Sequence, residues 1–327
     1  MILLQTTEAI GSTTLFVWLM NQLRALAELR TPIMTAIMSA VTYLGHEMVL
    51  LVVAMILAWC VDKRYGYRFL GAFMLGSFLQ QALKAIFMIP RPWIIDPTFL
   101  AVESAIPAAS GYSFPSGHTL TACITLGGVA VLVKKNWAYL LAVLLSLTVA
   151  FSRMYLGVHT LLDVVVGFLL GVIVLVFFGV MFRKEGEQNK KLNMILIIGT
   201  AACIGLLTFL LISPQPDDPA SITTTKESIG NAYVLVGAAC GMLTGKFMDD
   251  RFVHFETKAV WWVQVIKVAI GLVIALAVRA GLKVVFGDTN ETALLRGVRY
   301  FAMTVVCIGF YPMLFKSICK LDKKKQV

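Results

Sequence analysis

The sequence predicts an all-α, polytopic integral-membrane bundle, and three observations lead to that fold class. The 327 residues are 59% hydrophobic and only 14% charged, whereas soluble domains carry about 25% charged residues. The mean hydropathy is +0.83. Apolar runs of about 20 residues recur along the chain, and this is the length of a helix that crosses a bilayer.

Proline, glycine and polar residues divide the apolar runs into an interfacial helix and about nine membrane spans. Residues 8–30 mix Trp18 and Leu19 with Gln22 and Arg24, which favours a helix lying in the interface plane; a poor membrane span is the alternative. Spans are expected at roughly 36–60, 68–88, 118–133, 137–153, 160–182, 192–213, 230–246, 259–279 and 297–316.

A polar stretch near the middle of the chain separates these spans into two groups. It follows the fifth span and contains Lys184, Lys190 and Lys191. We therefore expect a catalytic membrane module over 1–183, a cytoplasmic linker over 184–191 and a four-helix membrane module over 192–327.

The net charge of +10 does not indicate a nucleic-acid partner, because the basic residues lie in short loops between apolar runs. Most of them fall on one side of the expected topology, including the pairs Lys63–Arg64 and Lys134–Lys135 and the C-terminal tail. The positive-inside rule makes that side cytoplasmic. Residues 89–117 and 153–160 then face outward, in a multi-pass protein of the cell membrane.

The six cysteines lie in or beside apolar spans, without a C-x-x-C pair or a metal-type spacing. This pattern favours small buried hydrophobic side chains over ligands. We expect neither a metal nor another cofactor.

Three segments hold polar residues that a membrane should otherwise exclude, and the expected topology places all three at the same outer face. A charge at mid-bilayer costs about 2.5–3.5 kcal/mol on insertion scales, so such residues are expected to share one polar pocket. The segments carry Lys84 with Arg91-Pro92, then Pro115-Ser116-Gly117-His118, and finally Ser152-Arg153 with His159 and Asp163.

The cations of these segments suit a phosphoryl group. Lys84, Arg91 and Arg153 supply three positive charges, and the transition state of phosphoryl transfer spreads its negative charge over three equatorial oxygens. Ser116 and the first N–H groups of the helix expected from 118 add hydrogen-bond donors, because a helix N-terminus favours anions.

Two histidines and a carboxylate complete the predicted chemistry. His159 and Asp163 are four residues apart and share a helical face. The carboxylate can hold one ring nitrogen and leave the other free to attack phosphorus. His118 comes from another span and is placed to protonate the leaving oxygen.

These motifs resemble the three-part signature of the type-2 phosphatidic acid phosphatase superfamily, which also includes bacterial acid phosphatases and vanadium haloperoxidases. The resemblance covers about residues 40–182. It implies that His159 forms a phosphohistidine, that Asp163 is its partner and that His118 is the general acid. It further implies that phosphate is bound by Lys84, Arg91, Ser116, Gly117 and Arg153.

The expected function is hydrolysis of a membrane lipid phosphate or diphosphate at the outer leaflet. Polyprenyl diphosphate is the first candidate, ahead of phosphatidic acid and phosphatidylglycerol phosphate. The alternatives are a lipid-phosphate phosphotransferase and a transporter that binds a phosphorylated solute. The sequence does not predict an oligomeric state.

Four cations of the C-terminal module form two pairs on helical faces. Arg279 and Lys283 are four apart, and Arg296 and Arg299 are three apart. The expected topology places them on the outer side. They predict either head-group anchoring by snorkelling side chains or a grip on the substrate's head group.

Overall fold

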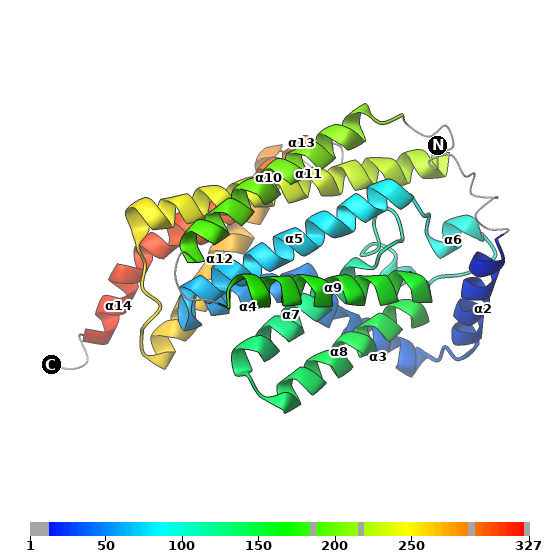
Figure 1. Cartoon of the computed structure of the whole chain (residues 1–327), viewed down its shortest axis with the longest axis horizontal. Coiled ribbons are helices and arrows are strands. Elements are labelled where there is room, and N and C mark those ends of the chain that lie inside the picture. The colour runs from blue at the N-terminus through cyan, green and yellow to red at the C-terminus, as the bar shows by residue number, and fades with distance from the viewer. Residues whose placement is uncertain (1–12, 184–187, 215–218, 287–291, 324–327) are drawn as a thin grey trace. The chain divides into compact units, whose positions relative to one another are not determined.

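The computed structural model describes residues 13–183, 188–214, 219–286 and 292–323, and these residues form helices without a strand (Figure 1). Seven of the helices are long and apolar enough to cross a membrane. The pair Pro32–Gly45 and Glu47–Val61 is long and apolar enough only when taken together, and its bend of 46° fits either a broken span or a re-entrant loop. The helix α7 (Gly117–Val133) is apolar but shorter. The prediction of an all-α polytopic membrane protein is confirmed.

The described residues form two compact units, neither of which is continuous in sequence. The first unit contains 1–50, 75–183 and 213–228, and the second contains 51–74, 184–212 and 229–327. Of the expected linker, residues 184–187 lie outside the described residues, and Gln188 begins the helix α10 (Gln188–Ile212). The division into modules at 183 and 192 stays a prediction.

The N-terminal helix α2 (Thr14–Glu28) belongs to the first unit. It begins where the Thr13 hydroxyl accepts a hydrogen bond from the Phe16 N–H, an N-cap. Phe16 and Leu23 are buried while Trp18 is half exposed, so apolar side chains occupy more than one face. Residues 8–12 of the expected interfacial helix lie outside the described part, and its place in the interface stays a prediction.

The span expected over 36–60 is interrupted. The helix α3 (Pro32–Thr42) ends in a 3₁₀ turn at Tyr43–Gly45, and the helix α4 (Glu47–Ile56) begins after His46. A side chain at Gly45 would come within 2.5 Å of the His118 carbonyl oxygen. Only a glycine therefore lets the break approach the start of α7 this closely.

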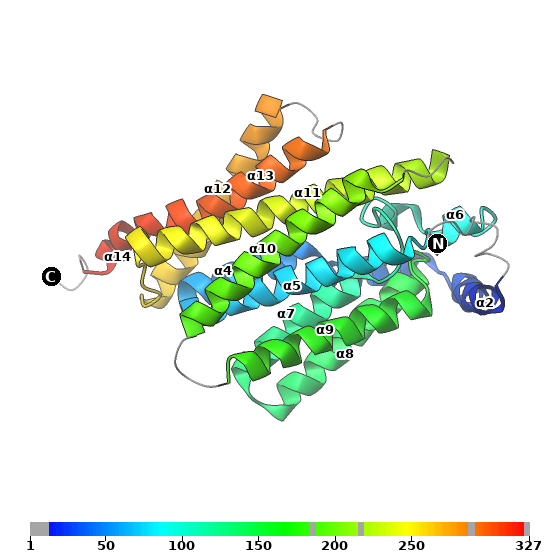
Figure 2. The ribbon, with the colours of Figure 1, turned by 45° about the horizontal axis from the view of Figure 1, so that its top comes forward.

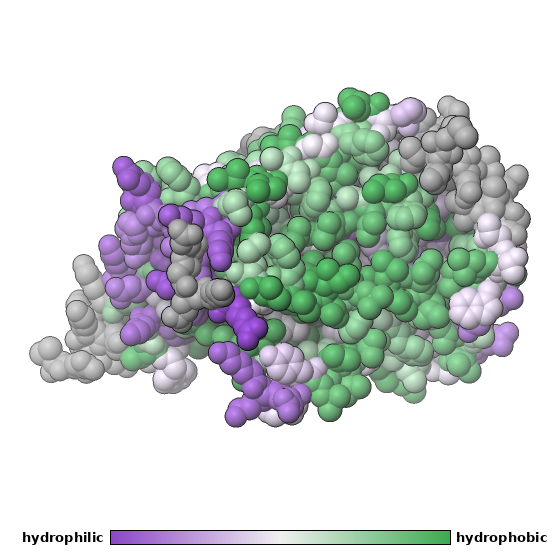
Figure 3. Space-filling model, in the orientation of Figure 1, coloured by the Kyte–Doolittle hydropathy of each residue, from purple (hydrophilic) through white to green (hydrophobic). Residues whose placement is uncertain are grey.

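Three helices form the body of the first unit, namely α7, α8 (Asn136–Tyr155) and α9 (Leu161–Met181), and α7 packs against both of the others. Figures 1 and 2 show them as neighbours. The outer sides of α8 and α9 are apolar, as the green surface in Figure 3 shows. Exposed residues there include Leu140, Leu144, Leu147, Leu169, Ile173 and Val176. Such a surface suits lipid as its solvent.

Helix direction brings the polar segments to one end of this unit. The helix α5 (Lys63–Phe87) and α8 end there, and α7 and α9 begin there. The chain reverses between α8 and α9 at Gly157, whose φ of +78° is in the left-handed region. The pair Lys134–Lys135 joins α7 to α8 at the other end, about 30 Å away along the 20-residue α8.

The second unit contains α10, most of α11 (Pro219–Met248), α12 (Trp261–Phe286), α13 (Ala293–Val305) and α14 (Phe315–Lys323). A stripe at spacing four, Gly237, Gly241 and Gly245, faces α13 and the turn after it. A methyl group at Gly237 would lie 2.0 Å from the Gly297 carbonyl oxygen. Small residues at this spacing let membrane helices pack backbone to backbone, and the motif is visible in the sequence.

Candidate active site

The three polar segments meet at the end of the first unit where α7 and α9 begin. Lys84 lies in the last turn of α5, and Arg91 follows in the loop before the short helix α6 (Pro92–Ile95). Arg153 lies in the last turn of α8. All three cations are at least 96% buried, so each needs an anion or a set of acceptors nearby.

Asp163 is oriented by two hydrogen bonds to one oxygen of its carboxylate. Oδ2 accepts from the Ser113 hydroxyl at 2.6 Å and from the Thr160 N–H at 2.7 Å. Thr160 caps α9 and accepts in turn from the Asp163 N–H, which makes a capping box. The same Oδ2 lies 3.5 Å from Nδ1 of His159. The carboxylate is thereby held in place beside the imidazole.

Arg91 binds the loops on either side of His159. Nε donates to the Gly111 carbonyl at 2.9 Å, Nη2 to the Ser110 carbonyl at 3.0 Å and Nη1 to the Val158 carbonyl at 2.9 Å. Nη1 also lies 3.0 Å from Nε2 of His159. Nη1 lies 3.4 Å from Nδ1 as well. A guanidinium only donates, so the shorter contact favours the tautomer with its lone pair on Nε2 and its proton on Nδ1, the nitrogen nearer Asp163.

Arg153 has the donors that are most clearly available to bind an anion. Its Nη1 donates to the Thr42 hydroxyl at 3.1 Å. Nε and Nη2 are buried and have no hydrogen-bond partner among the described residues. A buried unpaired donor on a charged group is costly, and a phosphate oxygen would satisfy both donors at once.

Lys84 adds a third cation to the same neighbourhood. Its charge interacts with those of Arg91, Arg153, Asp163 and Glu227. Three cations face two carboxylates, so the cluster carries excess positive charge in a buried setting. That imbalance favours a bound dianion.

The start of α7 supplies the remaining predicted groups. Ser116 is its N-cap and accepts from the Thr119 hydroxyl at 3.0 Å. Gly117 and His118 follow as the first helical residues, whose N–H groups have no partner within the helix. A side chain at Gly117 would come within 2.9 Å of Gln80 Nε2, so any larger residue there would have to displace the Gln80 amide.

His118 lies beside a second imidazole. The ring centroids of His118 and His46 are 5.9 Å apart, at 77° to one another. The charge of His118 also interacts with those of Arg153 and His159. The geometry therefore places His118 in the electrostatic field of the cluster, on the side of the break between α3 and α4.

His159 lies in the loop between α8 and α9 and is 98% buried. Its pKa is well below the usual 6.5, first because burial disfavours the imidazolium and then because Arg91, Arg153 and Lys84 repel it. The ring is therefore neutral at pH 7. A neutral imidazole with its lone pair on Nε2 is the form that can act as a nucleophile.

Two residues that hold Asp163 were not predicted from the sequence. Thr160 is visible in retrospect, because Thr160-x-x-Asp163 is a capping-box spacing. Ser113 has no such pattern, since its contact with Asp163 spans 50 positions.

The four C-terminal cations belong to the second unit and are not alike. Arg279 is exposed on α12, whereas Arg296 and Arg299 on α13 are half-buried. Arg296 donates to the Asn231 side chain at 3.4 Å. Lys283 lies in α12, but its side chain is outside the described residues. Their predicted role at a head group remains a prediction.

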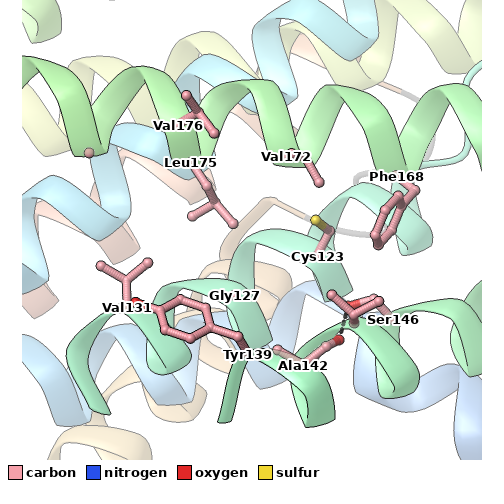
Figure 4. Close-up of a pocket in the computed structure, with 12 residues that line it drawn as sticks. Cys123, Gly127, Val131, Tyr139, Ala142, Ser146, Phe168, Val172, Leu175 and Val176 are labelled. Carbon is pink, nitrogen blue, oxygen red and sulfur yellow. Dashed lines mark hydrogen bonds between the residues drawn. The ribbon is translucent and has the colours of Figure 1, made fainter. Parts of the chain in front are cut away.

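An apolar cavity of about 340 Å³ lies among α7, α8 and α9, apart from the polar cluster (Figure 4). Its lining includes Cys123, Leu175 and Val176. The Ser146 hydroxyl on its wall donates to the Ala142 carbonyl at 2.7 Å and needs no other partner. This cavity lacks charged groups among its lining residues and is not a candidate for the chemistry.

The fold and the site define an integral-membrane protein with a buried cationic cluster between helix ends. The chain matches the PAP2 superfamily over residues 65–187, and the transmembrane extension of PAP2 superfamily phosphatases over 233–324. Together with the relatives below, these matches show that the chain belongs to the PAP2 superfamily.

Curated relatives include lipid phosphatases from several kingdoms. The chain is 32% identical to phosphatidylglycerophosphatase B of Bacillus subtilis, over 51% of the chain and 83% of the relative. It is 30% identical to undecaprenyl-diphosphatase of Sulfolobus acidocaldarius, over 46% and 71%. Sphingosine-1-phosphate phosphatase 1 of Rattus norvegicus is 28% identical over 62% of the chain, which spans about half of that relative, 46%.

A solved structure also resembles the chain. It is the transmembrane PAP2-type phosphatidylglycerolphosphate phosphatase from Bacillus subtilis, 26% identical, with a TM-score of 0.44, covering 55% of this chain and 92% of that one.

Proposed function

We propose that the protein is a lipid phosphatase that hydrolyses a lipid phosphate monoester or diphosphate through a phosphohistidine. One observation carries the proposal: Arg153 holds two buried donors that have no partner in the described part of the chain, in the same cluster as Lys84, Arg91 and a neutral His159. A phosphoryl group supplies the negative charge and the acceptors that this arrangement lacks.

The first step transfers the phosphoryl group to the protein. Nε2 of His159 attacks phosphorus, and the P–O bond to the leaving group breaks. His118 gives its proton to the leaving oxygen. Asp163 stabilises the positive charge that develops on the ring of His159, since its Oδ2 lies 3.5 Å from Nδ1.

The second step returns the site to its starting state. Water attacks the phosphohistidine, and neutral His118 accepts a proton from that water. The P–N bond breaks and its electrons return to Nε2 of His159. In both steps the equatorial oxygens are bound by Arg91, Arg153 and Lys84. The positive charge of these side chains stabilises the transition state most.

The substrate class is proposed from the membrane setting and the relatives. Polyprenyl diphosphate, phosphatidic acid and phosphatidylglycerol phosphate all present a phosphate at the membrane surface. We place the beginnings of α7 and α9 at that surface because they are the ends of apolar helices. The names of three relatives, which are enzymes of undecaprenyl diphosphate, phosphatidylglycerophosphate and sphingosine 1-phosphate, support a lipid phosphate. We further propose that the site faces outward in the cell membrane, as the distribution of basic residues indicates.

The test is release of inorganic phosphate by the detergent-purified protein from these three lipids. We expect release from at least one lipid, loss of release in His159→Ala, and an acid-labile phosphoenzyme trapped by rapid quenching in alkali. Absence of release from every lipid and from a soluble aryl phosphate would contradict the proposal. Transfer to an added alcohol in place of water would assign the protein to the phosphotransferases.

A further inference from the structure

Residues 219–228, the first turns of α11, belong to the first unit with the phosphate site. They lie outside both family matches, which cover 65–187 and 233–324. Neither the sequence motifs nor the comparisons assign these residues a role. Thr224, Thr225 and Ser228 are nonetheless at least 95% buried, so this segment is packed rather than solvated.

The segment makes two hydrogen bonds to the loop that precedes α7. The Gly111 N–H donates to Oε2 of Glu227 at 2.5 Å. The hydroxyls of Tyr112 and Thr225 lie 2.8 Å apart. A carboxylate that accepts a backbone N–H makes a charge-assisted bond, which is stronger than a neutral one.

Gly111 connects this carboxylate to the nucleophile. Its N–H is held by Glu227, and its carbonyl accepts from Nε of Arg91. Arg91 in turn lies 3.0 Å from Nε2 of His159. The backbone at Gly111 has φ +67°, a left-handed conformation that glycine adopts without steric cost. Two residues further along the same loop, Ser113 binds Asp163.

Glu227 also acts on the site by its charge. Its carboxylate interacts electrostatically with both Lys84 and Arg91. It therefore offsets part of the positive charge that binds phosphate. A group of this kind would weaken the hold on the inorganic phosphate product as well as on substrate.

We propose that Glu227 is a positioning residue of the phosphatase site, which holds Gly111 and thereby Arg91, and which moderates phosphate affinity by its charge. The inference rests on the proposed function. It assigns to the start of α11 an indirect part in the reaction, through one effect of hydrogen bonding and one of charge.

Two variants distinguish these effects. Glu227→Gln keeps an oxygen that accepts the Gly111 N–H but removes the charge, whereas Glu227→Ala removes both. The control variants are Glu103→Gln and Glu103→Ala, at an exposed carboxylate of the same outer loop. The readouts are kcat and KM on a soluble aryl phosphate and the inhibition constant of orthovanadate, with melting temperatures to compare folding.

For Glu227→Ala we expect kcat to fall at least about tenfold, because misplacement near a reacting group is costly. For Glu227→Gln we expect kcat within about threefold of wild type, and vanadate inhibition about tenfold tighter, because one negative charge beside two cations is gone. Both Glu103 variants should match wild type.

Wild-type kcat in Glu227→Ala would overturn the positioning role, and unchanged vanadate inhibition in Glu227→Gln would overturn the charge effect. Vanadate inhibition of Glu227→Gln remains a test even if Glu227→Ala fails to fold. Wild type and His159→Ala are assayed alongside. Activity in wild type and none in His159→Ala would establish the phosphatase activity. Glu227 variants with wild-type kcat and vanadate inhibition would then contradict only the role of Glu227.

Discussion

Nη1 of Arg91 lies 3.0 Å from Nε2 of His159 and donates at the same time to the Val158 carbonyl. The same nitrogen lies 3.4 Å from Nδ1, so the guanidinium borders both ring nitrogens and is nearer to the one that is not directed to Asp163. Phosphorus must take this place for Nε2 to attack it, and the guanidinium must then bind a phosphate oxygen. Arg91 is therefore expected to keep the nucleophile neutral in the free protein and to stabilise charge in the transition state.

The first prediction concerns the pH dependence. The pKa of His159 is lowered by burial and then by Arg91, Arg153 and Lys84, so the ring stays neutral until the pH falls well below 6.5. The acidic limb of kcat/KM, which reports the free protein, is expected below pH 6.5. Bound phosphate favours the imidazolium, so the limb of kcat should lie at higher pH than that of kcat/KM.

A control separates His159 from ionisation of the substrate. Arg91→Gln removes the second cause of the lowered pKa, so it should move the limb of kcat/KM to higher pH. Ionisation of the substrate's phosphate would leave the limb where it is. A limb of kcat/KM at or above pH 6.5 in wild type would contradict the neutral nucleophile.

The second prediction concerns His118 as the general acid. His118→Ala should reduce kcat on a lipid phosphate by about 10²–10⁴-fold, because an alkoxide is a poor leaving group without a proton. An aryl phosphate leaves readily, so its kcat should change far less. His159→Ala should abolish turnover of both. Equal losses for His118→Ala on the two substrates would show that His118 does not protonate the leaving oxygen.

The grouping of the site residues could be predicted from the sequence, because it depends on local spacing and on helix direction. His159 and Asp163 are close in sequence, and each of the other motifs lies at a helix end. Once the apolar runs are read as antiparallel spans, these ends meet at one face. The structure brings Lys84, Arg91, His118, Arg153, His159 and Asp163 to one end of the first unit, while their roles remain proposals.

Contacts between distant segments could not be predicted in this way. Glu227 lies 116 positions from Gly111, and Ser113 lies 50 from Asp163, and no periodicity links such pairs. The break at Tyr43–Gly45 was also missed, because it occurs without proline and depends on the fit of Gly45 against α7. These features follow from tertiary packing rather than from local preference.

The third prediction concerns the face of the membrane. Ser104 is exposed in the loop before α7, and Lys135 is exposed between α7 and α8, at the other end of the first unit. In intact cells a membrane-impermeant thiol reagent should label Ser104→Cys but neither Lys135→Cys nor the native Cys319. Permeabilised cells should label all three. Labelling of Lys135→Cys alone in intact cells would place the phosphate site in the cytoplasm.

The last prediction separates the cations of the second unit. Arg279 is exposed on α12 and free to meet a head group, whereas Arg296 packs against α11, where it donates to Asn231. A side chain at Gly230 would come within 2.5 Å of Nη1 of Arg296, so this arginine packs closely over the backbone of α11.

Arg296→Ala should therefore lower the melting temperature in detergent. The free energy of unfolding should fall by about 1–3 kcal/mol, as is typical when a partly buried hydrogen-bonded group is lost. Arg279→Gln should leave the melting temperature unchanged. If Arg279 grips the head group, the same substitution raises KM for a lipid diphosphate without changing kcat, since binding made equally in ground and transition states appears in KM. Unchanged KM in Arg279→Gln would reduce this residue to an anchor at the membrane surface.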